Sequence, residues 1–211
     1  MINFRMKALV LGMVQTNCYI ISNGDTKEAI VIDPADNADK IEQYLKANDL
    51  VCGDILLTHG HFDHIMAAKE LSQQLHAKIY ACAAEAELLF RPELNASSQI
   101  GRECSVIADI WLQDEQELKL AGFTIKVIHT PGHTAGGVCY YFTGQGILLS
   151  GDTLFCESIG RSDLPTGNGS LLVASIQSKL MPLEDTVKVF PGHGSSTTIG
   201  YEREHNLYLL Y

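Results

Sequence analysis

Several features that mark other classes of protein are scarce or absent in this chain of 211 residues. No stretch approaches the ~18 apolar residues of a membrane-spanning helix, so no membrane association is expected. The six cysteines form no Cys-x-x-Cys pair, and most lie in apolar stretches where a free thiol packs as a small core residue. This usage is typical of a reducing compartment, and we expect a cytoplasmic protein.

Basic residues are in deficit. Lysine and arginine total 15 against 25 aspartates and glutamates, which gives a formal net charge of −10. A polyanion would meet a repulsive average field, so a nucleic-acid partner is not expected. The apolar run that follows Arg5 and Lys7 is short and lacks an Ala-x-Ala cleavage site, which favours strands over a secretion signal.

What remains is an ordinary globular composition, with 46% hydrophobic and 19% charged residues. The length suits one large domain better than two, and we predict a single domain over residues 1–211. Neither low-complexity segments nor short tandem repeats interrupt it.

The apolar periodicity predicts strands and helices in the order strands, helices, strands, helices. The expected strands cover residues 4–11, 17–23, 28–33, 54–58, 78–81, 118–120, 124–130, 138–142, 146–150 and 187–190. The expected helices cover residues 36–48, 83–90, 170–180 and 201–210, with a further helix after residue 64. Two sheets packed face to face with helices outside would satisfy this order, which predicts a four-layer αββα sandwich of the α/β class.

The densest group of metal-binding side chains is the segment Thr58-His59-Gly60-His61-Phe62-Asp63-His64. His59 and His61 are two residues apart, so on an extended backbone both side chains leave the same face and can bind one ion. Asp63 and His64 are adjacent and diverge, which suits a second ion. The alternative is that Asp63 caps the following helix, but that role leaves the three histidines unexplained.

Three further residues of metal-binding type follow predicted strands, namely His133, Asp152 and His193. Each is flanked by glycine, which lets the backbone turn sharply and lets a bulky centre approach. Any one of them alone would more often be a surface residue or a satisfied core residue. Together with the histidine cluster they could converge on one cleft, and we interpret them as ligands.

The seven residues make a chemically sensible pair of sites. They divide into His59, His61 and His133 for one ion, Asp63, His64 and His193 for the other, and Asp152 as a bridge. Such nitrogen and oxygen donors favour two zinc ions, and iron or manganese would also fit. Asp63 could both bind metal and orient the nucleophile, which makes it the candidate catalytic residue.

Four ordered motifs carry a resemblance to a known family. They are Thr-His-x-His-x-Asp-His at 58–64, Thr-Pro-Gly-His-Thr at 130–134, Gly-Asp-Thr-Leu-Phe at 151–155 and Pro-Gly-His-Gly at 191–194. The sequence resembles the metallo-β-lactamase superfamily and, within it, the glyoxalase II-like hydrolases. The resemblance spans nearly the whole chain, and it implies the αββα sandwich and the ligand roles given above.

The resemblance also implies roles for residues outside the ligand set. Asp33 would accept hydrogen bonds that support the metal loop, although an aspartate that begins a turn after a strand is an equally good interpretation. Asn17 and Phe155 occupy positions that suggest substrate contacts in the cleft.

The segment 160–165, Gly-Arg-Ser-Asp-Leu-Pro, looks like a loop of compact single-domain glyoxalase II-like proteins and is also similar to one in persulfide dioxygenases. Arg161 could bind a substrate carboxylate, or it could pair with Asp163 and close the loop. Full-length glyoxalase II carries a C-terminal helical domain that helps to hold glutathione, whereas eighteen residues follow His193 here. Glutathione recognition therefore stays open.

These features predict a metallohydrolase of the hydroxyacylglutathione hydrolase type. Two ions that share a water would provide hydroxide at neutral pH, which would attack an acyl thioester such as S-lactoylglutathione, a small-molecule partner. The nearest alternative is a mononuclear-iron persulfide dioxygenase on the same fold. A non-catalytic metal-binding module is a further alternative, and a secreted β-lactamase is disfavoured. The oligomeric state is not predicted.

Overall fold

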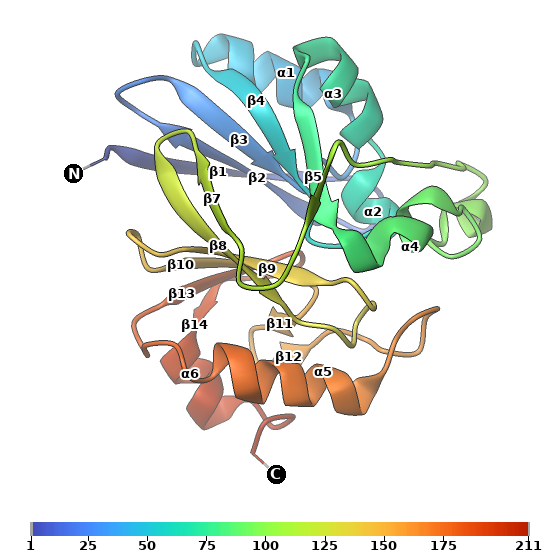
Figure 1. Cartoon of the computed structure of the whole chain (residues 1–211), viewed down its shortest axis with the longest axis vertical. Helices are drawn as coiled ribbons and strands as arrows, with labels where there is room; N and C mark the ends of the chain where they lie inside the picture. The colour runs from blue at the N-terminus through green and yellow to red at the C-terminus, as the bar shows by residue number, and fades with distance from the viewer. Residues whose placement is uncertain (1, 211) are drawn as a thin grey trace.

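Alternate apolar side chains of a strand enter two different hydrophobic cores, one between the two sheets and one under the outer helices. Ile20 and Val31 face one side of the first sheet, whereas Ile21 and Ile30 face the other side and pack against residues of the second sheet such as Phe142. Because successive side chains of a strand point to opposite faces, the middle of a strand that is buried on both faces is a continuous apolar run. The computed structural model, which describes residues 2–210, accordingly shows two sheets face to face with helices on both outer faces (Figure 1).

The first sheet contains six strands. In spatial order they are β1 (Phe4–Leu11), β2 (Thr16–Asn23), β3 (Glu28–Ile32), β4 (Val51–Leu56), β5 (Lys78–Cys82) and β6 (Ile110–Leu112). The pairs from β1 to β3 are antiparallel and those from β3 to β6 are parallel. The short edge strand β6 was not expected from the sequence.

The second sheet also contains six strands. In spatial order they are β14 (Thr197–Thr198), β13 (Lys188–Pro191), β10 (Ile147–Gly151), β9 (Val138–Phe142), β8 (Phe123–His129) and β7 (Glu117–Leu120). Only the β10–β13 pair is parallel. A separate hairpin joins β11 (Leu154–Phe155) to β12 (Ser158–Ile159), and these two strands, like β14, were not expected.

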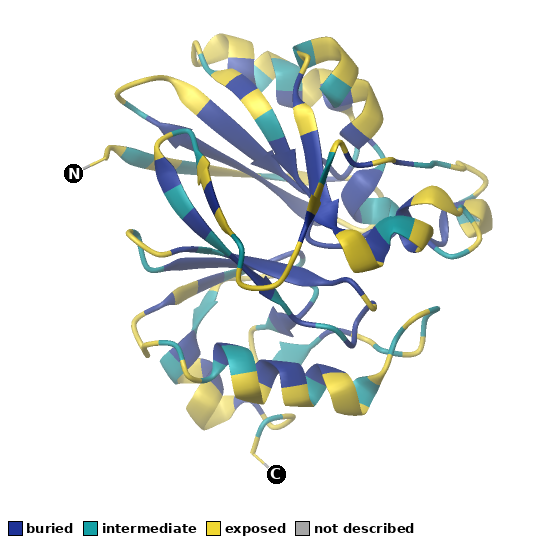
Figure 2. Cartoon of the chain, in the orientation of Figure 1, coloured by how far each residue is buried: buried dark blue, intermediate teal, exposed yellow. Residues whose placement is uncertain are grey.

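The helices lie outside the two sheets, with their exposed faces toward solvent (Figure 2). On the first sheet these are α1 (Ala38–Ala47), α2 (Phe62–Ile65), α3 (Ala68–Leu75) and η1 (Ala83–Glu85) followed by α4 (Ala86–Phe90); η2 (Ser97–Ile100) follows in the loop before β6. On the second sheet they are α5 (Gly169–Ser175), continued by the π-helix η3 (Ile176–Leu180), and α6 (Ile199–His205). The αββα prediction is confirmed. None of the helices within residues 2–210 has the length and apolarity to cross a membrane.

The helix predictions differ from the structure in detail. Residues 83–90 form the 3₁₀ helix η1 followed by α4, and residues 170–180 end in the π-helix η3. The helix expected after the histidine cluster is divided into α2 and α3, because the amide of Ala67 donates to the Pro34 carbonyl at 3.0 Å instead of continuing the helical ladder. The last helix begins at Ile199 and ends at His205, earlier than residues 201–210 suggested.

Candidate metal centre

The seven predicted ligands come together at one edge of the sandwich, where strands of both sheets end. The loop after β4 provides His59 and His61, and helix α2 provides Asp63 and His64. The segments after β8, β10 and β13 provide His133, Asp152 and His193. Hydrogen bonds join the two sheets here, since the Val138 amide donates to the Thr58 carbonyl at 2.8 Å and the Tyr140 hydroxyl to the Leu57 carbonyl at 2.7 Å. The two halves of the site are thus held in register.

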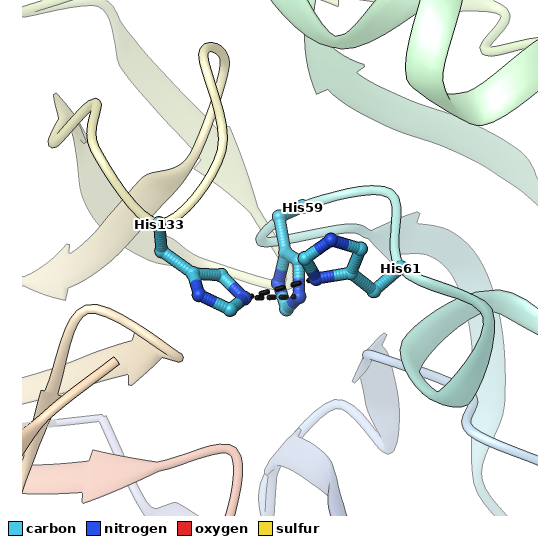
Figure 3. A group of neighbouring side chains, drawn as sticks. All are labelled: His59, His61 and His133. Carbon is cyan, nitrogen blue, oxygen red and sulfur yellow. Dashed lines mark hydrogen bonds between the residues drawn. The ribbon is translucent and has the colours of Figure 1, made fainter. Parts of the chain in front are cut away.

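His59, His61 and His133 form a buried group that we call the three-histidine position. Nε2 of His133 lies 2.9 Å from Nδ1 of His61 and 3.2 Å from Nε2 of His59, and the three rings point toward one another from two loops (Figure 3). Nitrogen atoms this close, on side chains less than 5% exposed, form a set that could hold one metal ion.

Neighbouring acceptors orient two of these rings. Nδ1 of His133 lies 2.6 Å from the Arg161 carbonyl, and Nδ1 of His59 lies 3.1 Å from the Thr58 hydroxyl oxygen. Protons on these Nδ1 atoms leave the Nε2 lone pairs free to face the position. Burial lowers the pKa of all three histidines, that of His61 to about 3, so the rings are neutral at pH 7 and ready to bind metal.

Asp63, His64 and His193 form the second group, which we call the mixed position. Oδ2 of Asp63 lies 3.5 Å from Nε2 of His64 and 3.1 Å from Nε2 of His193, and it accepts a hydrogen bond from the Thr16 hydroxyl at 3.0 Å. One oxygen and two nitrogens therefore face a common point. The N-cap of α2 is His61, with Asp63 inside the first turn, so the alternative role of Asp63 as a helix cap is wrong.

The carboxylate of Asp152 lies between the two positions. Its Oδ1 is 3.3 Å from Nε2 of His64, and its Oδ2 is 3.7 Å from Nε2 of His133 and 3.5 Å from Nε2 of His193. The Oδ1 of Asp152 and the Nε2 of His64 are buried without a hydrogen-bond partner. Buried polar atoms without partners are costly, and a cation would satisfy both, so the donor set fits a pair of metal ions.

The charges of the mixed position support one another. Burial by itself would lower the pKa of His64 and His193, but Asp152 and Asp63 raise both. Conversely, burial would raise the pKa of Asp63 and Asp152, but His64 lowers both. In the metal-free protein this group is therefore a cluster of ion pairs, unlike the neutral three-histidine position.

Asp33 lies beneath the metal loop, buried and with a positive φ of 50°. Its carboxylate accepts from the amide and the hydroxyl of Thr58 at 2.8 and 2.7 Å and contacts Nδ1 of His64 at 2.9 Å. These contacts are those expected of a residue that supports the loop, and they leave Nε2 of His64 to face the mixed position. Asp33 directly follows β3, but residues 33–35 form no turn, so the supporting role is the interpretation that the structure fits.

Asn17 holds the His193 loop and does not line the cleft. Its side-chain amide donates to the carbonyls of Pro191 and Gly194 at 3.0 and 3.1 Å. Its backbone amide donates to the Gly192 carbonyl at 2.7 Å. A Cβ on Gly192 would lie 2.3 Å from Oδ1 of Asp152, so only glycine fits beside this carboxylate. The structure thus gives Asn17 a supporting role in place of the expected substrate contact.

An open cleft of about 430 Å³ leads to the two positions. Phe155 and Arg161 line it, as the sequence suggested. The Arg161 guanidinium forms two hydrogen bonds of 2.7 Å with Asp163, so the predicted clasp exists at the rim of the cleft. The apolar part of the lining comes from Val14, Phe62, Ala96, Phe155 and Leu164.

Sequence reasoning missed two supporting residues. Thr16 contacts Asp63, and Glu85 accepts hydrogen bonds from loops that carry histidines of the three-histidine position. Neither belongs to a motif that binds metal. The only local signal was the position of Thr16 beside Asn17.

The fold and this donor set together define a metal-binding hydrolase. The model of the metallo-beta-lactamase superfamily matches residues 11–193, and the chain belongs to that family.

Similar proteins extend this assignment over almost the whole chain. Hydroxyacylglutathione hydrolase GloC of Haemophilus influenzae is 38% identical over 198 residues, which cover 92% of this chain and 93% of that protein. The solved structure of BLEG-1 B3 metallo-beta-lactamase superposes with a TM-score of 0.93 at 41% identity, covering 98% of this chain and 100% of that one. TTHA1623 in a di-iron-bound form gives a TM-score of 0.86 at 33% identity, covering 96% and 100%.

Proposed function

We propose that the protein is a glyoxalase II-like thioesterase that hydrolyses an acyl thioester such as S-lactoylglutathione with two metal ions. The observation that carries the proposal is the carboxylate of Asp152, which lies within 3.7 Å of histidines from both positions. The similarity to GloC along most of both chains supports the substrate class.

We propose that all seven residues bind metal, with Asp152 as the bridge and Asp63 as the residue that also orients the nucleophile. Zinc suits this set of nitrogen and oxygen donors, and the di-iron form of TTHA1623 supports iron as an alternative. Bound at these positions, divalent ions would lower the pKa of water toward about 7 and stabilise developing negative charge.

The residues of the chain supply the remaining requirements. Asp63 is fixed by the Thr16 hydroxyl, so its second oxygen can accept a proton or a hydrogen bond at the mouth of the cleft. The apolar side chains of Val14 and Phe155 can cover the acyl group beside it. A thiolate is a good leaving group, which agrees with the absence of a separate general acid among the described residues of the cleft lining.

Arg161 is the candidate for recognition of the thiol carrier. Its guanidinium is exposed at the rim of the cleft and paired with the equally exposed Asp163. A carboxylate of the carrier could replace Asp163 without moving a buried group. We propose this exchange as the contact that favours carriers with a free carboxylate.

The test combines metal analysis with hydrolysis of S-lactoylglutathione by the same purified protein. We expect two ions per chain and hydrolysis that needs no oxygen. Asp63→Ala and His64→Ala should each lower turnover by about two orders of magnitude or more, because each removes a metal donor, while circular dichroism shows an unchanged fold. Near-normal turnover in either variant would refute the assignment.

Two other outcomes would replace the proposal. One iron per chain with oxygen uptake on glutathione persulfide would indicate a persulfide dioxygenase, and two ions without turnover of any thioester would indicate a non-catalytic module. The similarity to BLEG-1 favours β-lactam hydrolysis as a second candidate function. The chromogenic β-lactam nitrocefin, assayed with the same preparation, tests it directly.

A further inference from the structure

Glu85 is a buried carboxylate that lies between two loops of the metal centre. It is 1% exposed and ends the short helix η1 on the first sheet. Its Oε1 accepts from the Gly60 amide at 3.0 Å and its Oε2 from the Gly136 amide at 2.6 Å. No lysine or arginine within residues 2–210 forms an ion pair with it or affects its pKa. Burial raises the pKa of Glu85, and the Thr134 side chain together with these two amides stabilises the charged carboxylate against it.

Both amides belong to loops that carry metal-binding histidines. Gly60 lies between His59 and His61, and Gly136 lies three residues after His133. A Cβ on Gly136 would lie 2.4 Å from both the amide nitrogen and Oε2 of Glu85, so only glycine lets this loop approach so closely. The carboxylate thus joins a loop of the first sheet to a loop of the second.

We propose that Glu85 is a positioning residue that sets the distance between the His59–His61 pair and His133, and thereby the metal affinity of the three-histidine position. The inference rests on the metal-binding role proposed above. The Gly60 and Gly136 amides donate to the same carboxylate, which fixes the position of one loop relative to the other. A further hydrogen bond between these parts of the chain runs from the Val138 amide to the Thr58 carbonyl.

The effect should be confined to one position. The ligands of the mixed position have other supports: Asp33 contacts His64, Thr16 contacts Asp63, and Asn17 holds the loop of His193. None of these supports touches Glu85. A change at Glu85 should therefore weaken one of two metal-binding events and leave the other unchanged.

The test is a titration of zinc into the metal-free protein, in which calorimetry measures the affinity of each ion. Glu85→Gln keeps the shape but offers one oxygen and one amino group to two donors, so one glycine amide loses its acceptor. We expect the affinity of one ion to fall roughly 10–100-fold while the affinity of the other stays within twofold. Two unchanged affinities would overturn the proposal.

Glu202→Gln is the matched control. Glu202 is also buried, and it accepts from the Glu157 amide, the Thr197 hydroxyl and the Asn206 side-chain amide at 2.9, 2.6 and 2.8 Å, away from both metal positions. We expect this variant to lower the unfolding midpoint while both zinc affinities are kept. Equal loss of zinc affinity in the two variants would show general destabilisation and contradict the proposal.

Glu85→Asp separates geometry from charge. The shorter side chain keeps the charge but cannot reach both glycine amides, so the same selective loss of affinity is expected. Wild-type affinity in this variant would contradict the bridging role. Failure of the proposed function would instead appear in the wild-type protein, as an absence of two-ion binding.

Discussion

The three-histidine position and the mixed position share one cleft but differ in how the protein prepares them. Burial keeps His59, His61 and His133 neutral, so their nitrogens are free for a cation. In the mixed position Asp63 and Asp152 raise the pKa of both histidines, so protons compete with a metal ion for these donors. The same residue type is therefore a neutral ligand in one position and a charged ion-pair partner a few ångströms away.

The supports of the two positions differ as well. The three-histidine position depends on the Arg161 carbonyl, on the Thr58 hydroxyl and on Glu85, which joins loops of the two sheets. The mixed position depends on the side chains of Asp33, Thr16 and Asn17, all from the first sheet. Asp33 is linked to both positions, because it contacts His64 and also holds Thr58. Glu85 and the pair Thr16 and Asn17 are separate supports, so changes at these residues should weaken one position without the other.

The largest effect is expected when the carboxylate of Asp152, which the two positions share, is removed. Asp152→Asn should release at least one ion and lower turnover by about 10³-fold, because a lost bridge costs several kcal/mol of charge stabilisation. Metal analysis and thioester hydrolysis measure both effects. Asp114→Asn, which changes a carboxylate paired with Lys179 outside the cleft, is the control. Two retained ions with turnover within tenfold of wild type would count against a bridge.

Proton release sharpens the comparison. Because the pKa values of His64 and His193 are raised, protons compete with metal at the mixed position up to a higher pH than at an ordinary histidine, and the metal affinity should fall as the pH falls through those values. The three-histidine position should release fewer protons when it binds metal at the same pH, since burial lowers the pKa of all three histidines, that of His61 to about 3.

Calorimetry in two buffers of different ionisation enthalpy measures the protons released by each ion. His193→Ala removes the mixed position, so the one ion that this variant still binds should release almost no protons. Equal release from both positions of the wild-type protein would show that the electrostatic difference is absent.

A moderate effect is expected from the support of the His193 loop. Asn17→Ala removes two hydrogen bonds to the carbonyls of Pro191 and Gly194, and it should lower the affinity of the mixed position roughly tenfold while sparing the other. Asn23→Ala is the control, because this amide donates to the Ala121 carbonyl at 3.1 Å outside the cleft. Stepwise zinc titration of both variants would expose an equal loss, which would rule out a specific role for Asn17.

The smallest effect should come from Arg161. His133 contacts the backbone carbonyl of this residue and not its side chain, so Arg161→Gln should keep both ions. Because the guanidinium is exposed, KM for a carboxylate-bearing thioester should rise about fivefold at most, with kcat unchanged. A thioester without a carboxylate serves as the control substrate. Loss of metal in this variant would show that the side chain also supports His133.

Much of the architecture could be predicted from local pattern. The alternation of Ile20 and Ile21 between two cores follows directly from strand periodicity, and most strands lie within a residue or two of their expected bounds. The strands β6, β11, β12 and β14 were missed because they contain only two or three residues, too few for a period to appear. The break between α2 and α3 was missed because the Pro34 carbonyl that causes it comes from a distant loop.

The candidate site divides in the same way. His59, His61, Asp63 and His64 could be grouped from spacing alone, because they lie within six consecutive residues. Asn17 was assigned to the cleft from its place in the family pattern, whereas its amide is directed to carbonyls more than 170 residues away. Glu85 had no signal at all, since its partners Gly60 and Gly136 become neighbours only when the two sheets pack.

The sequence by itself determined which donor atoms exist and which strands they follow, because ligand chemistry and backbone periodicity are local properties. Tertiary structure decided which histidines share a position, which of them carry protons, and which residues hold the loops. Those properties depend on burial and on charges brought together from distant parts of the chain, and a linear pattern contains neither distance nor solvent exposure.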